Sequence, residues 1–360
     1  MTALRDLLLR RIGQNGPITL ADYMAECLLH PEHGYYTTRD PLGRAGDFTT
    51  APEISQMFGE LVGLCLAQTW LDHGAPAPFT LAEPGPGRGT LMADIWRATR
   101  GVPGFHAAAR IHLVEASPVL RAAQARALPH GRVIWHDTLD DLPEQPLFLI
   151  ANEFFDALPI RQFQRAGNGW RERVVGISEG RLTPGLTAPI PLAALAHRLA
   201  DTRDGDIVET CAAAAPPMSA IETRIHDHGG AAIVVDYGDW RSRGDTFQAL
   251  AAHAFVDPFE CPGMADLTAH VDFEALATAA PRLSASALTP QGALLRALGI
   301  DARAQRLAQS LQGEALSSHL RAYHRLTADE EMGTLFKALA LVRPGAPLPP
   351  GFAPQPAPGG

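Results

Sequence analysis

The chain has 360 residues, of which 46% are hydrophobic and 19% are charged, and its formal net charge is −9 at pH 7. This composition is typical of a globular protein with a sizeable core and excludes a largely disordered chain. The negative charge argues against general nucleic-acid binding, because a surface that follows phosphates needs clustered lysine and arginine. A basic protein or peptide partner is compatible with it.

Signals for targeting, membrane insertion and metal binding are weak. No stretch approaches the roughly 20 apolar residues that span a bilayer, and residues 1–11 lack the apolar core of a secretory signal. The cysteines are scattered without a Cys-x-x-Cys pair, which favours free thiols in a reducing compartment. His30, His33, His226 and His228 lack a convergent third ligand, so no metal site is predicted. We expect a cytoplasmic protein without membrane insertion.

Residues 1–75 are predicted to be helical, with a loop inside. The stretch 34–50 is rich in Gly, Thr and Asp and favours an ordered loop. Its last part, Gly46-Asp47-Phe48, is a candidate lid over a ligand, with a plain structural loop as the alternative. Thr50-Ala51-Pro52-Glu53 has the pattern of a capping box with proline in the first turn, and it predicts the start of a long helix.

From residue 79 onward, short apolar runs alternate with helical segments, which predicts an α/β fold with a doubly wound, mostly parallel, Rossmann-like sheet. We expect residues 1–75 to form an N-terminal helical region and 76–342 the main domain. Insertions are expected at about 160–200 and 240–330, the first beginning with a β-hairpin, and residues 343–360 are expected to be a disordered tail. The apolar runs lie at 79–82, 111–114, 133–135, 147–151 and 231–235.

An acidic or amide residue follows each apolar run. It comes directly after the run in every case except 133–135, where His136 precedes Asp137. In an open α/β sheet, ligands bind beyond the carboxyl ends of the strands. The strand ends that carry these polar groups therefore mark one rim of the sheet as the functional face.

A glycine-rich motif, Glu83-Pro84-Gly85-Pro86-Gly87-Arg88-Gly89-Thr90, lies between the first run and a helix. Glycines at alternate positions allow a sharp turn and a close approach of a ligand. The spacing G-x-G-x-G differs from the G-x-G-x-x-G of dinucleotide folds. It favours S-adenosylmethionine, whose amino-acid moiety would lie at the turn with Glu83 facing its ammonium group. The alternative is a tight structural turn.

Glu115 and Asp137 end the next two strands. Glu115 is placed to accept both ribose hydroxyls, and Asp137 to accept from the adenine amino group. Either carboxylate alone is as well explained as a helix N-cap. Together with Gly85, Gly87, Gly89 and Thr90, they predict a complete cofactor site.

The fourth strand ends in Asn152-Glu153-Phe154-Phe155-Asp156. An arginine side chain stays protonated in proteins, so carboxylates such as Glu153 and Asp156 would hold its guanidinium group. Phe155 would help to exclude water. The alternative is that Asp156 caps a helix and Phe155 belongs to the core.

Three long stretches, 46–60, 83–92 and 152–159, together resemble the MidA-like methyltransferase family, and the resemblance continues through 114–117, 236–238, 266–273 and 332–337. The resemblance implies a class I methyltransferase fold and S-adenosylmethionine as cofactor. It also implies symmetric dimethylation of an arginine in a peripheral-arm subunit of respiratory complex I, which aids assembly of the complex. Because the family's mitochondrial members begin with a targeting peptide that is absent here, the chain resembles a bacterial relative.

Two other functions are weighed against a protein arginine methyltransferase. One is a non-catalytic assembly chaperone that keeps the fold. The other is an NAD-dependent oxidoreductase, which the G-x-G-x-G spacing disfavours.

Overall fold

The computed structural model describes residues 2–38, 49–129 and 131–356. The chain forms two compact units, each made of segments that are distant in sequence. The first unit comprises Met1–Phe48, Asp156–Ala215 and Arg241–Asp272, and the second comprises Thr49–Phe155, Pro216–Trp240 and Phe273–Gly360. The boundary at residue 48 divides the expected N-terminal region, 1–75. Residues 1–48 group with much of the two expected insertions, 160–200 and 240–330.

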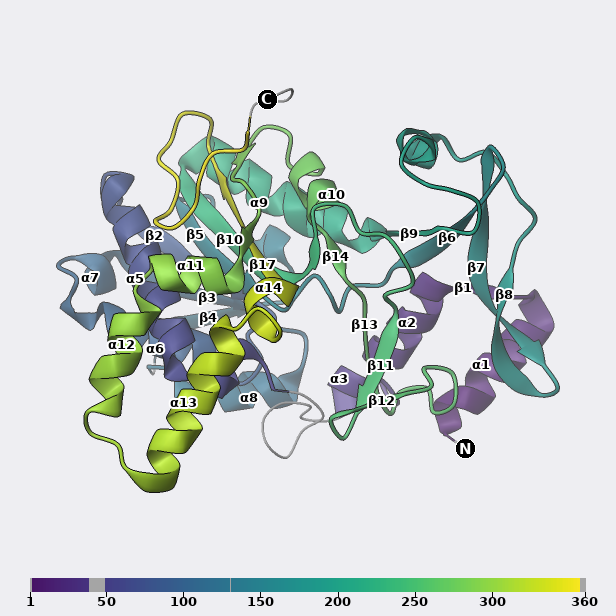
Figure 1. Cartoon of the computed structure of the whole chain (residues 1–360), viewed down its shortest axis with the longest axis horizontal. Helices are drawn as coiled ribbons and strands as arrows, with labels where there is room; N and C mark the ends of the chain where they lie inside the picture. The colour runs from purple at the N-terminus through teal and green to yellow at the C-terminus, as the bar shows by residue number, and fades with distance from the viewer. Residues whose placement is uncertain (1, 39–48, 130, 357–360) are drawn as a thin grey trace. The chain divides into compact units, whose positions relative to one another are not determined.

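The second unit contains the predicted parallel sheet (Figure 1). Its helices and strands are, in chain order, α4 (Ala51–Ile54), α5 (Gln56–Asp72), β2 (Phe79–Pro84), α6 (Thr90–Ala98), η1 (Thr99–Gly101), α7 (Phe105–Ala108), β3 (Ala109–Val114), α8 (Pro118–Ala127), β4 (Val133–His136), η2 (Leu139–Asp141), β5 (Leu147–Asn152), α9 (Ala215–His228), β10 (Gly230–Asp239), α10 (Phe273–Thr278), β15 (Ser284–Ala285), β16 (Thr289–Pro290), α11 (Gln291–Ala297), α12 (Ile300–Ala308), α13 (Gly313–Thr327), α14 (Met332–Leu335) and β17 (Phe336–Val342).

The main sheet has the strand order β15-β17-β10-β5-β2-β3-β4. The strands from β10 to β4 are parallel neighbours, whereas β17 runs antiparallel to β10 and β15. From β2 the chain proceeds to β3 and β4 on one side and then to β5 and β10 on the other, so the switch point lies between β2 and β5. The predicted doubly wound, mostly parallel α/β fold is confirmed.

The register aligns the carboxyl ends of the central strands. Pro84 of β2 pairs with Val114 of β3, and Val114 pairs with His136 of β4. On the other side of the switch point, Asn152 of β5 pairs with Val235 of β10. The polar residues that follow these strands are therefore brought to one rim, as the sequence predicts.

Strand residues that alternate along the chain form one core with α5 and α6. In a parallel sheet both faces are covered, and β5 is accordingly buried along its whole length. Residues of this cluster include Phe58, Leu61 and Leu66 of α5, Leu91 and Ile95 of α6, and Phe79, Leu81, Ile111, Phe148 and Ile150 of the strands.

The first unit is built on antiparallel strands. Its elements are α1 (Ala3–Asn15), β1 (Ile18–Thr19), α2 (Leu20–Leu29), α3 (Tyr35–Thr38), β6 (Arg161–Ala166), β7 (Gly169–Ser178), β8 (Arg181–Leu186), η3 (Ala193–Leu199), β9 (Ile207–Thr210), η4 (Ala212–Ala214), β11 (Gln248–Ala251), β12 (Ala254–Val256), β13 (Asp266–Thr268) and β14 (Val271–Asp272). β6 and β7 form the predicted hairpin. In Figure 1, α1 and α2 (purple) lie alongside β7, and a shared apolar cluster joins these helices to β7, β8, β11 and β13.

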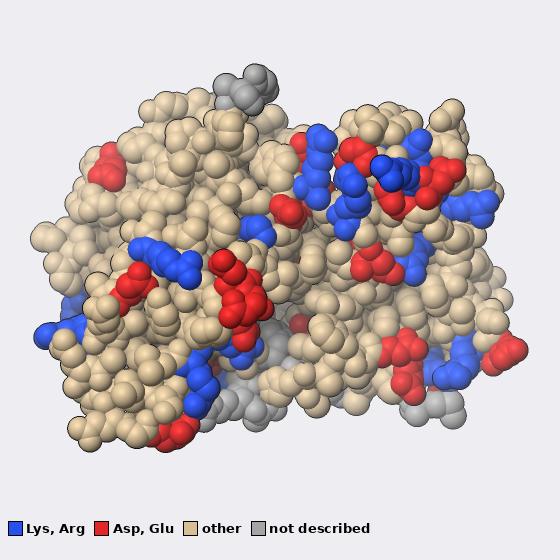
Figure 2. Space-filling view, viewed as in Figure 1, with Lys and Arg blue, Asp and Glu red and all other residues tan. Residues whose placement is uncertain are grey.

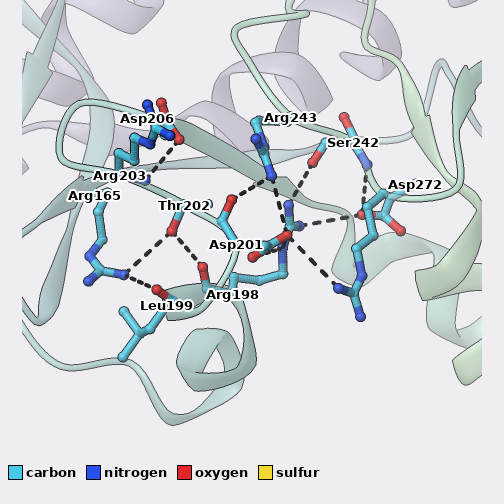
Figure 3. A network of polar contacts seen from close by, with 11 residues as sticks. Arg165, Arg198, Leu199, Asp201, Thr202, Arg203, Asp206, Ser242, Arg243 and Asp272 are labelled. Atoms are coloured by element: carbon cyan, nitrogen blue, oxygen red, sulfur yellow. Dashed lines mark hydrogen bonds and ion pairs between the residues drawn. The ribbon is translucent and has the colours of Figure 1, made fainter. Parts of the chain in front are cut away.

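Buried Arg198 ties separate segments of the first unit together. Its guanidinium group donates to both carboxylate oxygens of Asp201, at 3.2 and 3.0 Å, and to the carbonyl oxygen of Ser242 at 3.1 Å. Figure 3 shows this group directed also at Asp272, 3.8 Å away. Over the β6–β9 end of this unit, Figure 2 shows basic and acidic side chains side by side rather than one broad patch of a single sign.

Two local expectations differ from the structure. Thr50 precedes α4 without a side-chain hydrogen bond, and α5 begins separately after Ser55, whose hydroxyl accepts from the Met57 amide. The predicted capping box is therefore wrong. The Glu53 carboxylate accepts a hydrogen bond from the Thr90 hydroxyl instead.

The proline-rich segment after residue 342 is ordered in its described part, contrary to the expected disordered tail. The Ala287 amide donates to the carbonyl of Ala353, and Phe352 packs against the core of the second unit. An aromatic anchor and backbone pairing thus offset the ordering cost of this segment. No helix within the described ranges has the length and apolar composition to cross a membrane.

Candidate active site

The glycine-rich turn connects β2 to α6. Gly85, Gly87 and Gly89 have φ values of +61°, +54° and +83°, a region that side chains rarely adopt. A Cβ on Gly85 would lie 3.0 Å from the Phe154 side chain. The backbone conformation itself therefore favours glycine at these three positions.

Glu83 is buried near the end of β2, just before this turn. Glu83 is only 3% exposed, and its Oε2 has no hydrogen-bond partner among the described residues. Burial raises the pKa of this carboxyl to about 8, although a hydrogen bond from the Met92 amide opposes the shift. The Met92 amide thus links Glu83 to α6, and a role of Glu83 at the ammonium group of the cofactor stays a prediction.

Glu115 is oriented by two donors at the end of β3. The Ser117 amide donates to Oε1 at 2.8 Å, and Gln124 Nε2 donates to Oε2 at 3.2 Å. Burial raises the pKa of Glu115, and these hydrogen bonds oppose the shift. The carboxylate is therefore held in one orientation at the rim.

Gln124 of α8 is a site residue that the sequence reasoning missed. It is fully buried, and its Nε2 also donates to the carbonyl of Gly87 at 2.7 Å. Its Oε1 accepts from Trp135 Nε1 at 2.8 Å. One amide thus links the glycine turn, the end of β3 and strand β4. A polar residue on the buried face of a predicted helix was the available signal.

Asp137 follows β4 at the rim but is mostly exposed. Its side chain is 84% exposed and pairs with Arg121 at 2.5 Å. Arg121 also donates to the backbone carbonyls of Glu115 and His136, which ties the ends of β3 and β4 together.

Asn152 and Glu153 lie at the end of β5, beside the switch point. Glu153 Oε1 accepts from the Asn152 side chain at 3.1 Å and from the Ala51 amide at 3.0 Å. Glu153 has φ of +50°, a conformation that is uncommon for a residue with a side chain and often marks functional sites. Asn152 Oδ1 is buried without a partner among the residues described.

Phe155 and Asp156 have more interior positions than expected. Phe155 is buried against Phe154, and its amide donates to the Asp236 carboxylate at 3.0 Å. Asp156 belongs to the first unit, where its carbonyl oxygen accepts a hydrogen bond from the Ala269 amide. Burial raises the pKa of Tyr36, and the negative charges of Asp266 and Asp156 add to this shift. The candidate lid residues Gly46, Asp47 and Phe48 lie outside the described residues.

The second-unit residues fit the expected cofactor. The left-handed glycines let a ligand approach the turn closely, and an oriented carboxylate, Glu115, stands at the neighbouring strand end. Asn152 adds a buried acceptor at the next strand on the other side. The individual roles of these residues remain predictions.

Comparison with known proteins identifies the group to which this arrangement belongs. Residues 61–291 match the family Methyltransf_28, described as S-adenosyl-L-methionine-dependent methyltransferase. The zebrafish (Danio rerio) protein arginine methyltransferase NDUFAF7 is 36% identical, covering 92% of this chain and 85% of its own length. The human (Homo sapiens) protein of the same name is 37% identical, covering 93% and 82%.

A solved structure shares the fold over nearly the whole chain. A Burkholderia thailandensis protein bound to S-adenosyl-homocysteine has a TM-score of 0.81 and 29% identity, covering 97% of this chain and 94% of its own. The family match over more than half of the chain, together with these relatives, shows that the chain belongs to the Methyltransf_28 family of S-adenosylmethionine-dependent methyltransferases.

Proposed function

We propose that the chain transfers methyl groups from S-adenosylmethionine to the guanidinium group of an arginine in a protein. Membership of the family fixes the cofactor and the reaction class but leaves the acceptor open. Relatives named as protein arginine methyltransferases share 36% and 37% identity over more than 90% of this chain. The observation within the chain that supports arginine most directly is the oriented carboxylate of Glu153 at the switch point.

The cofactor is proposed to lie along the rim of the second unit. Gly85, Gly87, Gly89 and Thr90 would surround its amino-acid moiety, and Glu115 would accept from the ribose hydroxyls. Asp137 would accept from the adenine amino group, with Arg121 holding its carboxylate. When bound, the cofactor supplies an electrophilic methyl group on a sulfonium centre. Glu83 would support the turn from below.

The acceptor guanidinium is proposed to bind to Glu153, and Asp156 is a second candidate carboxylate. A planar guanidinium group pairs well with carboxylates, which also stabilise the charge that develops as a new nitrogen–carbon bond forms. The nitrogen that gains the methyl group must lose one proton, and Glu153 is the carboxylate proposed to accept it. The Ala51 amide and Asn152 would hold Glu153 in place for this step. Phe155 would help to exclude water.

The protein substrate is proposed to be a peripheral-arm subunit of respiratory complex I, dimethylated on one arginine in a bacterial cytoplasm. Transfer of a labelled methyl group to the lysate of a deletion strain tests this proposal. We expect one labelled protein, whose acid hydrolysate contains dimethylarginine. A label recovered on another amino acid would contradict the arginine acceptor. Arginine methylation that persists in the deletion strain, together with failed complex I assembly, would favour the chaperone function.

The Glu153→Gln variant tests the role of the carboxylate. We expect transfer to fall by about 100-fold or more, as for loss of a proton acceptor, while binding of S-adenosylhomocysteine changes little. Glu144→Gln is the control, because Glu144 is exposed in the same unit. Equal loss of transfer and of cofactor binding in Glu153→Gln would instead assign Glu153 to the cofactor site.

A further inference from the structure

Glu53 stands beside the glycine turn, although its place in the sequence is 30 residues before Glu83. It lies in α4, and its Oε1 accepts a hydrogen bond from the hydroxyl of Thr90 at 2.6 Å. Thr90 follows Gly89 and is the first residue of α6. The tertiary fold of the second unit therefore adds a carboxylate to the site where the turn meets the helix.

Glu53 is more exposed than Glu83, and a ligand needs this access to reach a carboxylate. Glu83 is 3% exposed and accepts a hydrogen bond from the Met92 amide. Glu53 is only partly buried, so its carboxylate is accessible to a charged ligand group. Its one hydrogen bond within the described chain uses a single oxygen, Oε1.

The basic side chain of α6 is engaged elsewhere. Arg97 of α6 pairs with Glu60 and Asp94, at 2.5 and 2.6 Å. Among the described residues, no ion pair joins Glu53 to an arginine or lysine. Burial is the main cause of the raised pKa of Asp94, and the negative charge of Glu53 adds to it. An ammonium group would supply the missing positive charge and up to three hydrogen-bond donors.

We propose that Glu53 accepts the ammonium group of the amino-acid moiety of S-adenosylmethionine, with the Thr90 hydroxyl fixing the orientation of its carboxylate. This assignment replaces Glu83 in that role. It rests on the proposed cofactor site but not on the identity of the methyl acceptor. The other end of α4 donates through Ala51 to Glu153, so this four-residue helix connects the ammonium-binding carboxylate to the proposed acceptor carboxylate.

Calorimetric binding of two ligands tests the proposal. The first ligand is S-adenosylhomocysteine, and the second is its analogue in which a hydroxyl group replaces the α-amino group. Glu53→Gln keeps the shape of the side chain and its bond to Thr90 but removes the charge. Since hydrogen bonds to charged groups contribute about 1.5–3 kcal/mol, we expect Glu53→Gln to bind S-adenosylhomocysteine about 10-fold to 100-fold more weakly. Binding of the hydroxyl analogue should change by less than about twofold.

Two matched variants complete the experiment. Glu144→Gln should bind both ligands as the wild type does, and Glu83→Gln should keep the preference for the amino ligand. An equal loss for both ligands in Glu53→Gln would show a structural role and overturn the proposal. Loss of the preference in Glu83→Gln, with Glu53→Gln unaffected, would overturn it in favour of Glu83.

Thermal unfolding without ligand shows whether each variant is folded before binding is compared. Because no methyl acceptor enters these measurements, their failure would leave the arginine acceptor untouched. A failed transfer assay would likewise leave the binding result standing.

Discussion

Replacing Gln124 by methionine removes three hydrogen bonds from the interior of the second unit while nearly keeping the length of the side chain. The carbonyl of Gly87, the carboxylate of Glu115 and the indole N–H of Trp135 would each lose a partner. A buried polar group left without a partner costs about 1–3 kcal/mol. Gly87 and Trp135 are partly exposed and can regain water, so the full cost applies mainly at Glu115. We expect Gln124→Met to lower the free energy of unfolding by about 2–4 kcal/mol.

The same substitution should weaken cofactor binding, because Glu115 loses the donor to its Oε2. We expect the affinity for S-adenosylhomocysteine to fall by roughly tenfold, equivalent to about 1.4 kcal/mol. Urea unfolding and calorimetry measure the two effects on one sample. Gln145→Met is the matched control, since Gln145 donates to Thr80 near the amino end of β2, away from the rim. Reduced stability with unchanged ligand affinity in Gln124→Met would refute the positioning role of Gln124.

Three further predictions concern stability. Gly85→Ala places a Cβ at a φ of +61° and 3.0 Å from Phe154. It should therefore lower the free energy of unfolding by about 1–2 kcal/mol in a denaturation assay. Gly101→Ala is the control and should be close to neutral, because there is open space around its Cβ. Arg198→Met leaves two partly buried carboxylates without their shared guanidinium partner and should cost the first unit about 2–3 kcal/mol, seen as an earlier calorimetric transition; an unchanged transition would contradict this role. The raised pKa of Glu83, about 8 against 4.5, means that the folded state keeps a proton that the unfolded state releases, so stability should be full below pH 4.5 and fall as the pH rises to about 8; this slope should be absent from melting temperatures of Glu83→Gln.

Signals that depend on local geometry were recognisable in the sequence. The glycines at 85, 87 and 89 and the alternation of apolar runs with helices follow from backbone sterics and burial, which act within a few residues. The alignment of Glu115 and Asp137 at one rim follows from the same pattern, because parallel strands bring their carboxyl ends to one edge.

Only the tertiary structure decided how these local elements are joined. Gln124 and Glu53 reach the site through helices whose rotation and packing no local pattern specifies. Thr50 makes no side-chain cap, and the Glu53 carboxylate accepts a hydrogen bond from Thr90, 37 residues away in the chain. Asp137 lies at the predicted rim, but its pairing with Arg121 depends on how α8 packs beside the end of β4.

The division into two units shows the same limit on a larger scale. Segments 156–215 and 241–272 pack with the N-terminal helices, although the intervening chain belongs to the second unit. Periodicity determined that a doubly wound sheet would form, and the glycine spacing determined that a sharp turn would follow its first strand. Long-range packing determined which polar groups are buried, paired and oriented, because burial and hydrogen bonding depend on residues that meet only after folding.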